Sequence, residues 1–252
     1  MAIKQSQADK DWKNSPDVST PILDTDLEAI SRANRDTRWF VPNGVTSIDE
    51  FDDDTLDPAW VRVDGTGAAA ANAGWTERGD LLSLYLNGGD NASVVHGLVR
   101  PLSSFGGAVA PGDAFVTAVR HWGQATNYTV SGLVLSDGVT HGSGSQVVSE
   151  INTGSNFTMF VASLGGSGWT LTNPPSFANL QPTTPLFLRL VCVTASTWRT
   201  DASPDGVSWI ACDSPQTKAF TPTHVGFLGS SWGAATKSVV SWEFLRRVSG
   251  VS

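Results

Sequence analysis

Charge is scarce in this chain, and basic charge is scarcer still. Charged residues make up 16% of the 252 residues, against about 25% in an average globular protein. The formal net charge is −8, and Arg246 and Arg247 are the one adjacent basic pair. Nucleic-acid binding needs clustered Lys and Arg to neutralise phosphates. We therefore expect no nucleic-acid partner and no attachment to an anionic membrane surface.

Long apolar runs are missing as well. No segment approaches the roughly 18 apolar residues that cross a bilayer, so we expect no membrane insertion. The opening stretch "MAIKQSQADKDWK" has no apolar region of the kind that a secretory signal peptide carries. We expect the chain to be made and folded in a cytoplasm.

Cysteine is nearly absent, since the chain has two. Cys192 and Cys212 lie in segments that we expect to flank the strand around Arg199 from opposite sides. Two strand spacings would separate them by roughly 9.5 Å, whereas a disulfide tolerates Cα separations only up to about 7 Å. The spacing predicts two free, buried thiols.

Helix signals are confined to the first 44 residues. Thr25 and Glu28 have the spacing of a capping box, and Leu27, Ile30 and Ala33 follow at helical spacing. So short and narrow a stripe does not hold a helix folded in water by itself. The helix must dock on its own domain, on copies of itself, or on a larger partner. We predict an N-terminal arm, residues 1–44, with one short helix, followed by a domain over residues 45–252.

Strand signals are what the chain has in abundance. Alternating or apolar runs recur between turns rich in Gly, Asn, Asp and Pro, which is typical of antiparallel sandwiches and barrels. The runs cover residues 59–65, 80–88, 93–102, 113–122, 129–138, 145–154, 156–166, 185–195, 196–203, 207–214, 223–231 and 237–248. No fixed period recurs, which disfavours a propeller or a solenoid. The pattern predicts an all-β fold, a two-sheet antiparallel jelly-roll sandwich.

The stretch "SPDGVSW", residues 203–209, is made of turn formers followed by an indole. Pro204 presets φ, Asp205 bonds its own backbone, and Gly206 takes a positive φ without penalty. We expect this turn to join residues 196–203 to 207–214 as a hairpin. The register would place Trp209 on one sheet face, where we interpret it as a core residue rather than a ligand contact.

Four segments resemble concanavalin A-like, or laminin G-like, jelly-roll domains. They are "IDEFDDDTLDPAWVRVDGTG" with "LLSLYLN", "FVTAVRHW…NYTVSGLVLSDG", "PLFLRLVCVTASTWRTDASPDGVSWIACDS" and "THVGFLGSS…KSVVSWEFLRRV". In this family a "GL" strand ends in Asp-Gly and a hairpin carries "S-x-D-G-x-x-W". The resemblance covers residues 48–248 and implies the concanavalin A-like fold for that stretch.

The N-terminal segment "KDWKNSPDVSTPILDTDLEAISRANRD" resembles a segment of bacteriophage tail and head-fibre proteins, in which a short helix assembles as a trimer on the virion. The matching positions are Trp12, Thr20, Pro21, Ile22, Leu27 and Ile30. The family often has Asn after the Leu, where this chain has Glu28. The resemblance implies an oligomerising arm that anchors to other virion proteins of the capsid or tail. It also implies a homotrimer and a location in the virion.

Some proteins of the concanavalin A-like family are glycosidases, so we looked for catalytic carboxylates. Retaining hydrolysis needs two carboxyl groups about 5 Å apart, commonly supplied as E-x-D-x-x-E on one strand. No pair among the glutamates has that spacing; they are Glu28, Glu50, Glu77, Glu150 and Glu243. We therefore predict no catalytic residue.

Metal ligands are equally hard to find. The acidic run at residues 49–57 we interpret as a solvated strand edge that discourages pairing between sheets. Calcium could bind there through oxygen ligands, but the run lacks the D-x-[DN]-x-[DN]-G loop. The four histidines, His96, His121, His141 and His224, have no metal-ligand spacing. We predict no metal and no cofactor.

Tryptophan is the remaining signal, with ten Trp against two Tyr. Trp122, Trp169 and Trp232 fall in segments that we expect to be turns. A sugar ring stacks on an exposed indole while amides reach its hydroxyls. The predicted glycan contacts are Trp122, Gln124, Asn127, Tyr128, Trp169, Asn173 and Trp232. The alternative is that these indoles cover the ends of the sandwich or an oligomer interface.

Together these observations favour a non-enzymatic phage virion protein, a tail or capsid appendage that displays its jelly roll to a host cell-surface glycan. Binding would gain from several weak sites acting together. Two alternatives stay open. One is a polysaccharide depolymerase of the same fold, tested by replacing Glu77, Glu150 and Glu243. The other is a purely structural decoration protein.

Overall fold

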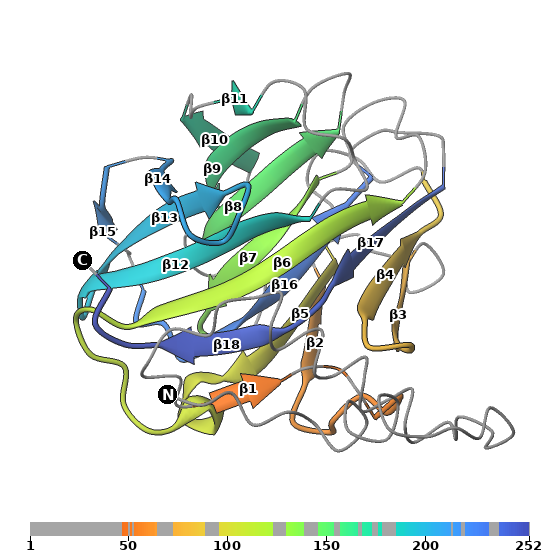
Figure 1. Ribbon diagram of the computed structural model, residues 1–252, viewed down its shortest axis with the longest axis horizontal. Coiled ribbons are helices and arrows are strands. Elements are labelled where there is room, and N and C mark those ends of the chain that lie inside the picture. Colours follow the sequence, from red (N-terminus) through yellow and green to blue (C-terminus); the bar gives the residue numbers. More distant parts are fainter. Residues whose placement is uncertain are drawn as a thin grey trace, which may run out of the picture. The chain divides into compact units, whose positions relative to one another are not determined.

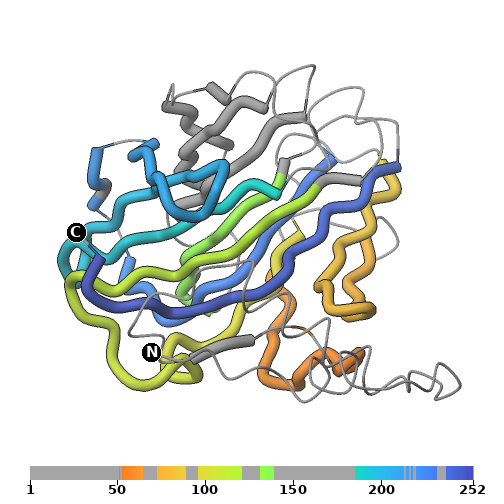
Figure 2. Tube along the Cα trace, viewed as in Figure 1, coloured from red at the N-terminus to blue at the C-terminus, as the bar shows by residue number. Residues whose placement is uncertain are grey.

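The computed structural model describes residues 47–49, 51, 53–64, 73–88, 96–122, 130–138, 146–153, 157–165, 168–172, 176–177, 185–212, 214–217, 220–231 and 237–251, most of them coloured in Figure 2. The chain divides into two compact units, Met1–Pro42 and Asn43–Ser252. The described residues all belong to the second unit. The predicted arm helix, with Trp12, Pro21, Ile22, Leu27 and Ile30, lies outside them. Within the described ranges, no helix is long and apolar enough to span a bilayer.

Two antiparallel sheets form the second unit (Figure 1). The ten-stranded sheet has the order β14-β13-β12-β6-β17-β4-β3, with β1, β15 and β18 paired beside this path. Its strands are β1 (Ser47–Asp49), β3 (Ala73–Glu77), β4 (Leu82–Leu86), β6 (Ala114–Trp122), β12 (Leu186–Thr194), β13 (Thr197–Ser203), β14 (Ile210–Ala211), β15 (Gln216–Thr217), β17 (Ser238–Trp242) and β18 (Leu245–Val248).

The eight-stranded sheet has the order β10-β9-β8-β7-β16-β5-β2, with β11 paired to β9. Its strands are β2 (Val61–Asp64), β5 (His96–Pro101), β7 (Val130–Ser136), β8 (Gln146–Thr153), β9 (Phe157–Gly165), β10 (Gly168–Thr172), β11 (Ser176–Phe177) and β16 (His224–Ser230). A single 3-10 turn, η2 (Leu102–Phe105), interrupts the described strands. The predicted fold class, an all-β two-sheet antiparallel jelly-roll sandwich, is confirmed.

Period-two alternation explains which faces meet. In β12 the side chains of Leu186, Leu188, Leu190 and Cys192 are buried in the core between the sheets, whereas the alternate Arg189 faces outward. Aromatic rings join the two layers, because Trp242 of β17 packs against Phe227 of β16 with ring centroids 4.9 Å apart. Trp75 of β3 also stacks on Trp242, with ring centroids 5.4 Å apart. Several of the ten tryptophans are therefore core residues: Trp60, Trp198 and Trp242 are buried, and Trp75 packs against them.

A β-bulge separates β17 from β18. Opposite β6, Trp242 pairs with Val119 and Arg246 pairs with Val116. The chain therefore uses four steps (242 to 246) where β6 uses three (119 to 116), so it carries one extra residue. The backbone N–H of Glu243 donates to Ala118 O at 3.0 Å inside this bulge. The single strand predicted over residues 237–248 is thus two strands with a change of face between them.

The cysteine prediction is confirmed. Cys192 and Cys212 are both free and buried. Cys192 pairs with Trp198 on one side of β13, and the Cys212 N–H donates to Thr200 O on the other side. Burial is the main reason that the pKa of the Cys192 thiol is raised, which lowers its reactivity.

The predicted hairpin at residues 203–209 is present, because β13 pairs with β14. Gly206 has φ +73°, and the Asp205 carboxylate accepts the N–H groups of Val207 and Ser208 at 2.8 and 2.7 Å. Hydrogen bonds from Ser208 and then Val207 hold the pKa of the Asp205 carboxyl below its ordinary value. The placement of Trp209 was wrong. It precedes β14, is half-buried and lies over Arg189 outside the core, because the loop takes up more residues than the four turn formers.

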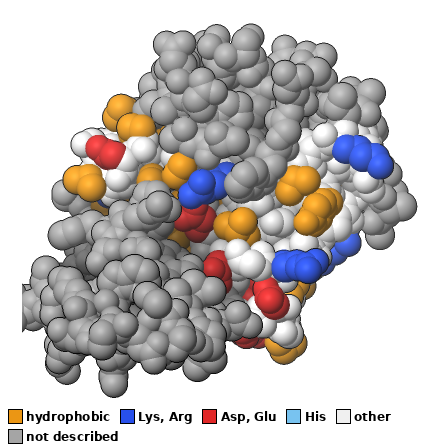
Figure 3. Space-filling view, turned by 45° about the vertical axis from the view of Figure 1, so that its right-hand side comes forward, with side chains coloured by type: hydrophobic (Ala, Val, Ile, Leu, Met, Phe, Trp, Pro, Cys, Tyr) orange, Lys and Arg blue, Asp and Glu red, His pale blue; other side chains and the backbone are white. Residues whose placement is uncertain are grey.

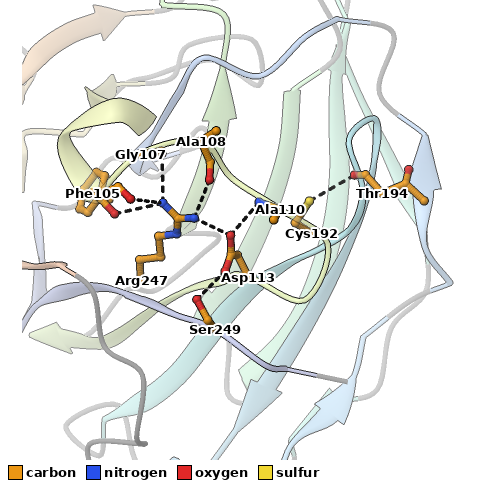
Figure 4. A network of polar contacts seen from close by, with 10 residues as sticks. Phe105, Gly107, Ala108, Ala110, Asp113, Cys192, Thr194, Arg247 and Ser249 are labelled. Atoms are coloured by element: carbon orange, nitrogen blue, oxygen red, sulfur yellow. Dashed lines mark hydrogen bonds and ion pairs between the residues drawn. The ribbon is translucent and has the colours of Figure 1, made fainter.

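A buried arginine fastens β18 to the loop before β6 (Figure 4). Arg247 donates to the carbonyl oxygens of residues 105–108 at 2.7–3.2 Å and to the Asp113 carboxylate at 2.6 Å. Asp113 also accepts from Ser249 Oγ and from the Ala110 N–H. We call this set, Arg247 with Asp113 and Ser249, the Arg247 clamp.

Candidate functional site

A row of cross-strand partners, which we call the aromatic row after Tyr85, crosses the outer face of the ten-stranded sheet. The register aligns Trp122 of β6 with Val239 of β17, Val239 with Tyr85 of β4, and Tyr85 with Gly74 of β3. Tyr85 is 48% exposed, and a Cβ on Gly74 would meet nothing within 4 Å. The sheet is therefore open beside the Tyr85 ring, which can present a flat apolar surface to a ligand.

A polar row lies next to the aromatic row, two residues along each strand. It joins Arg120, Ser241, Ser83 and Thr76 by direct cross-strand pairing. The hydroxyls of Ser83 and Ser241 are 2.8 Å apart and hydrogen-bonded. In Figure 3, which brings the β3–β4 side forward, basic side chains lie beside hydrophobic ones on the coloured surface.

A carboxylate joins this polar row at the bulge. Arg120 Nε and Nη2 both lie 2.5 Å from Glu243 Oε1. Because Arg120 shares the outer face with Ser241, the Glu243 carboxylate lies on that face too. Glu243 is buried, with 7% of the residue exposed, so its position is fixed by the bulge and by Arg120. Bulges that re-aim a side chain are common beside functional sites.

A second charged group lies further along the same face. Asp201 of β13 accepts from Arg189 Nε at 2.7 Å and from Arg199 Nε at 2.8 Å. The Trp209 ring covers Arg189, with the guanidinium carbon 4.4 Å from the ring centroid. Burial lowers the pKa of the Arg189 guanidinium, while its hydrogen bond to Asp201 acts in the opposite direction. The group combines an aromatic ring with two arginines that share one carboxylate.

The hairpin turn borders this second group. The Cβ of a side chain at Gly206 would come 3.3 Å from the Phe187 ring, so the turn lies against the outer face at β12. Val207 and Ile210, on either side of Trp209, are 66% and 47% exposed. The chemistry of the whole face is that of a polar ligand site, since rings can stack while hydroxyls, guanidinium groups and carboxylates hydrogen-bond.

Two of the seven predicted glycan contacts lie among the described residues, Trp122 and Trp169. Trp122 closes β6 and Trp169 lies within β10, so both are strand residues and not turn residues as expected. Trp122 falls in the aromatic row, whereas Trp169 belongs to the other sheet, paired with Leu164. The remaining predicted contacts lie outside the described residues; they are Gln124, Asn127, Tyr128, Asn173 and Trp232.

The acidic run at residues 49–57 is engaged in hydrogen bonds and an ion pair within the protein. Asp53 accepts the Thr55 N–H at 3.1 Å, Asp54 accepts the Gly79 N–H at 2.7 Å, and Asp57 binds Arg100 at 2.7 Å. A hydrogen bond with Glu77 is the main cause that lowers the pKa of the Asp53 carboxyl. Over the described ranges, no group of three or more His, Cys, Asp or Glu side chains is placed to hold a metal ion.

Sequence reasoning missed Tyr85 and Arg120, and it named Glu243 only as a residue to replace when testing the depolymerase alternative. Period-two alternation within residues 80–88 and 113–122 carried a signal for the first two, because both alternate with core residues and must face outward. Glu243 carried the same signal, since it follows the core residue Trp242 and lies two residues after Ser241. The bulge after it was not predictable, because it depends on pairing with β6.

Comparison with known proteins establishes the fold. No family model matches the chain, and no curated protein matches it. Solved structures do. The GH43 BlXynB protein from Bacillus licheniformis superposes with a TM-score of 0.58 at 16% identity over 80% of this chain. This chain spans 39% of the length of BlXynB.

Two further structures match over most of their own length. One comes from work on endo-acting O-glycanases of the human gut microbiota that initiate mucin breakdown, with a TM-score of 0.55, 13% identity, and coverage of 82% of this chain and 100% of that one. The other is SCLam, a non-specific endo-β-1,3(4)-glucanase of family GH16, with a TM-score of 0.50, 11% identity, and coverage of 83% and 93%. At these identities the likeness establishes the jelly-roll fold alone.

The comparisons correct two predictions, that the chain is not an enzyme and that it is a non-enzymatic phage virion protein. Structures that share its fold include glycoside hydrolases, among them a xylan β-1,4-xylosidase from Bacillus halodurans C-125 and the glucanase above. They agree better with the alternative, a polysaccharide depolymerase. The prediction rested on a search for carboxylates spaced along one strand, and such a search does not cover carboxylates brought together from separate strands. The phage-like arm, the homotrimer and the virion location stay predictions.

Proposed function

We propose that this jelly roll hydrolyses a polysaccharide bound across the outer face of its ten-stranded sheet. The observation that carries the proposal is the bulge that holds Glu243 against Arg120 beside the aromatic row. A sugar ring would stack on Tyr85, and its hydroxyls would reach the polar row. The likeness to carbohydrate-degrading enzymes supports a glycan as the ligand.

The reaction consumes one water molecule for each glycosidic bond. One carboxylic acid gives a proton to the leaving oxygen, while a carboxylate either takes a proton from the attacking water or attacks the sugar carbon itself. We assign the carboxylate role to Glu243, because its Oε1 accepts a hydrogen bond from Arg120 Nε and forms an ion pair with Arg120 Nη2. Glu77 and Glu150 lie off this face, because Glu77 shares the inner face of β3 with Trp75 and Glu150 belongs to β8 of the eight-stranded sheet.

The test is release of reducing ends from a panel of plant, microbial and mucin-type polysaccharides. We expect Glu243→Gln to lower the rate by roughly 10²–10⁴-fold, the range for a positioned acid or base, without changing the circular dichroism spectrum. Glu150→Gln is the matched control, since Glu150 lies on β8 of the eight-stranded sheet. It should retain the native rate.

Glu77→Gln adds a second control, because Glu77 does not lie on the outer face of the ten-stranded sheet. Loss of hydrolysis in Glu77→Gln or Glu150→Gln, with an unchanged circular dichroism spectrum, would place the reaction elsewhere. Hydrolysis by the native chain that survives Glu243→Gln would reject this site. Binding of a glycan with no release of reducing ends from any polysaccharide would reject hydrolysis.

A further inference from the structure

We propose that the glycan taken by this face is anionic, bearing carboxylate or sulfate groups. The inference rests on the proposed function, because it names the substrate class of the same site. It comes from the charge of the face, which is opposite in sign to that of the whole chain.

The outer face of the ten-stranded sheet concentrates arginine. Direct cross-strand pairs place Arg189 beside Val116 and Asp201, and Arg246 beside Val116. Alternation along β6 and β13 adds further charges to the same face. The outward charged residues of the described strands and of the bulge are the basic Arg120, Arg189, Arg199 and Arg246 and the acidic Asp201 and Glu243.

The balance on this face is positive. Three arginines with partly exposed side chains, less two carboxylates, leave an excess of one positive charge among these strand residues, because Arg246 is 4% exposed. The whole chain has 16 basic against 24 acidic residues and a net charge of −8. An acidic protein that gathers arginine on one face focuses a local field there, and such a field attracts anions.

The arginines are held ready for a ligand. The Asp201 carboxylate, 2% exposed, is shared by Arg189 and Arg199, whose side chains are 13% and 22% exposed. Arg120 is 23% exposed while its partner Glu243 is 9% exposed. In each group the carboxylate lies deeper than the guanidinium, so positive charge is what the face presents to solvent. Guanidinium groups fixed in this way bind carboxylate and sulfate-like oxygens with little loss of side-chain entropy.

The two arginine groups suit a polymer. Arg189 is opposite Val116 of β6, and Arg120 lies four residues further along β6 (116 to 120) on the same face. With one strand spacing across and four residues along, the Cα atoms lie about 14 Å apart. A single sugar cannot reach both groups, whereas an oligosaccharide with repeated acidic substituents can.

The experiment is affinity electrophoresis of the full chain in gels that contain matched pairs of polysaccharides. Polygalacturonate is paired with its methyl-esterified form, and chondroitin sulfate with desulfated chondroitin. We expect retardation by at least one anionic member and about tenfold weaker retardation by its neutral or less charged partner, the range for one charge-assisted hydrogen bond. The two pairs distinguish a carboxylate from a sulfate ligand. Retardation should fall as salt is raised, because the Debye length shortens.

Variants distinguish binding by this face from attraction by the net charge of the chain. Arg199→Gln should weaken binding about tenfold, while Arg199→Lys should keep most of it. Arg62→Gln, which removes the same charge from β2 of the other sheet, should leave binding unchanged. Equal retardation by charged and neutral partners, no retardation by any anionic glycan, or equal losses in the Arg199→Gln and Arg62→Gln variants would overturn the proposal. Because binding is scored without cleavage, a chain that binds anions but hydrolyses nothing would sink only the proposed hydrolysis.

Discussion

At the residue scale, the Arg247 clamp is the most demanding arrangement in the described part of the chain. A guanidinium and a carboxylate, each with 6% of the side chain exposed, face each other at 2.6 Å. Removing one partner of a buried pair leaves an uncompensated charge and costs about 3–5 kcal/mol. We expect Arg247→Met to lower the free energy of unfolding by that amount in a urea titration.

Arg62→Met is the matched control for the clamp, because Arg62 pairs with Asp64 at an exposed position. It should change the free energy of unfolding by less than about 1 kcal/mol. Acid titration tests the contribution of the clamp to stability in a second way. Burial acts to raise the pKa of the Asp113 carboxyl, but hydrogen bonds from Ser249 and Ala110 and the Arg247 guanidinium outweigh it, so the pKa lies below the ordinary 3.8.

A carboxyl whose pKa is lowered by folding stabilises the native state above its ordinary pKa, and that stabilisation disappears as the pH falls through the lower, folded value. The native chain should therefore lose stability as the pH drops below 3.8. Asp113→Asn, which cannot ionise, should show a shallower fall. Equal losses in Arg247→Met and Arg62→Met, or an unchanged acid slope in Asp113→Asn, would mean that the clamp contributes little.

At the scale of elements, glycines mark where the strands of the smaller sheet come close. A Cβ on Gly226 of β16 would lie 2.0 Å from Leu98 O and 2.6 Å from Val99 Cα. Because these atoms are backbone, they cannot move aside as a flexible side chain would. We expect Gly226→Ala to destabilise the fold by about 3 kcal/mol, measured as a shift in the urea midpoint.

Gly74→Ala offers the contrast, since a Cβ at Gly74 on β3 meets no atom within 4 Å. It should stay within about 0.5 kcal/mol of the native chain. A comparable loss in both variants would show that glycine itself, and not the close approach at β16, sets the cost.

The elements also show how much of the fold could be predicted from the sequence. Strands such as β12 were predictable because apolar and polar residues alternate within residues 186–194, which fixes both the strand and its faces. The short β3, with the sequence AGWTE, was missed because it contains too few apolar residues to show a period. The bulge at Glu243 was missed because "SWEFLRR" reads as one strand. The residues after Glu243 change face because Arg246 pairs with Val116 of β6, far away in the sequence.

At the scale of the whole molecule, the second unit has its own core. The buried cluster runs from Phe51 to Leu245 and draws on both sheets. We expect deletion of residues 1–42 to leave a chain that unfolds in one cooperative step with an unchanged urea midpoint. Sedimentation of both forms tests the predicted trimer, which should dissociate to a monomer when the arm is removed. A deletion form that does not fold would contradict the independence of the core.

The strand order has a consequence for biosynthesis. β16 lies between β7 and β5, and β17 lies between β6 and β4, so residues 224–242 fill the middle of both layers. While a ribosome is still producing the polypeptide, the earlier strands can form only separated halves with bare margins on each side. Closure waits until these late residues leave the exit tunnel. A premature stop codon before residue 224 would therefore release an aggregation-prone fragment that depends on chaperones, and not a smaller working version of the protein.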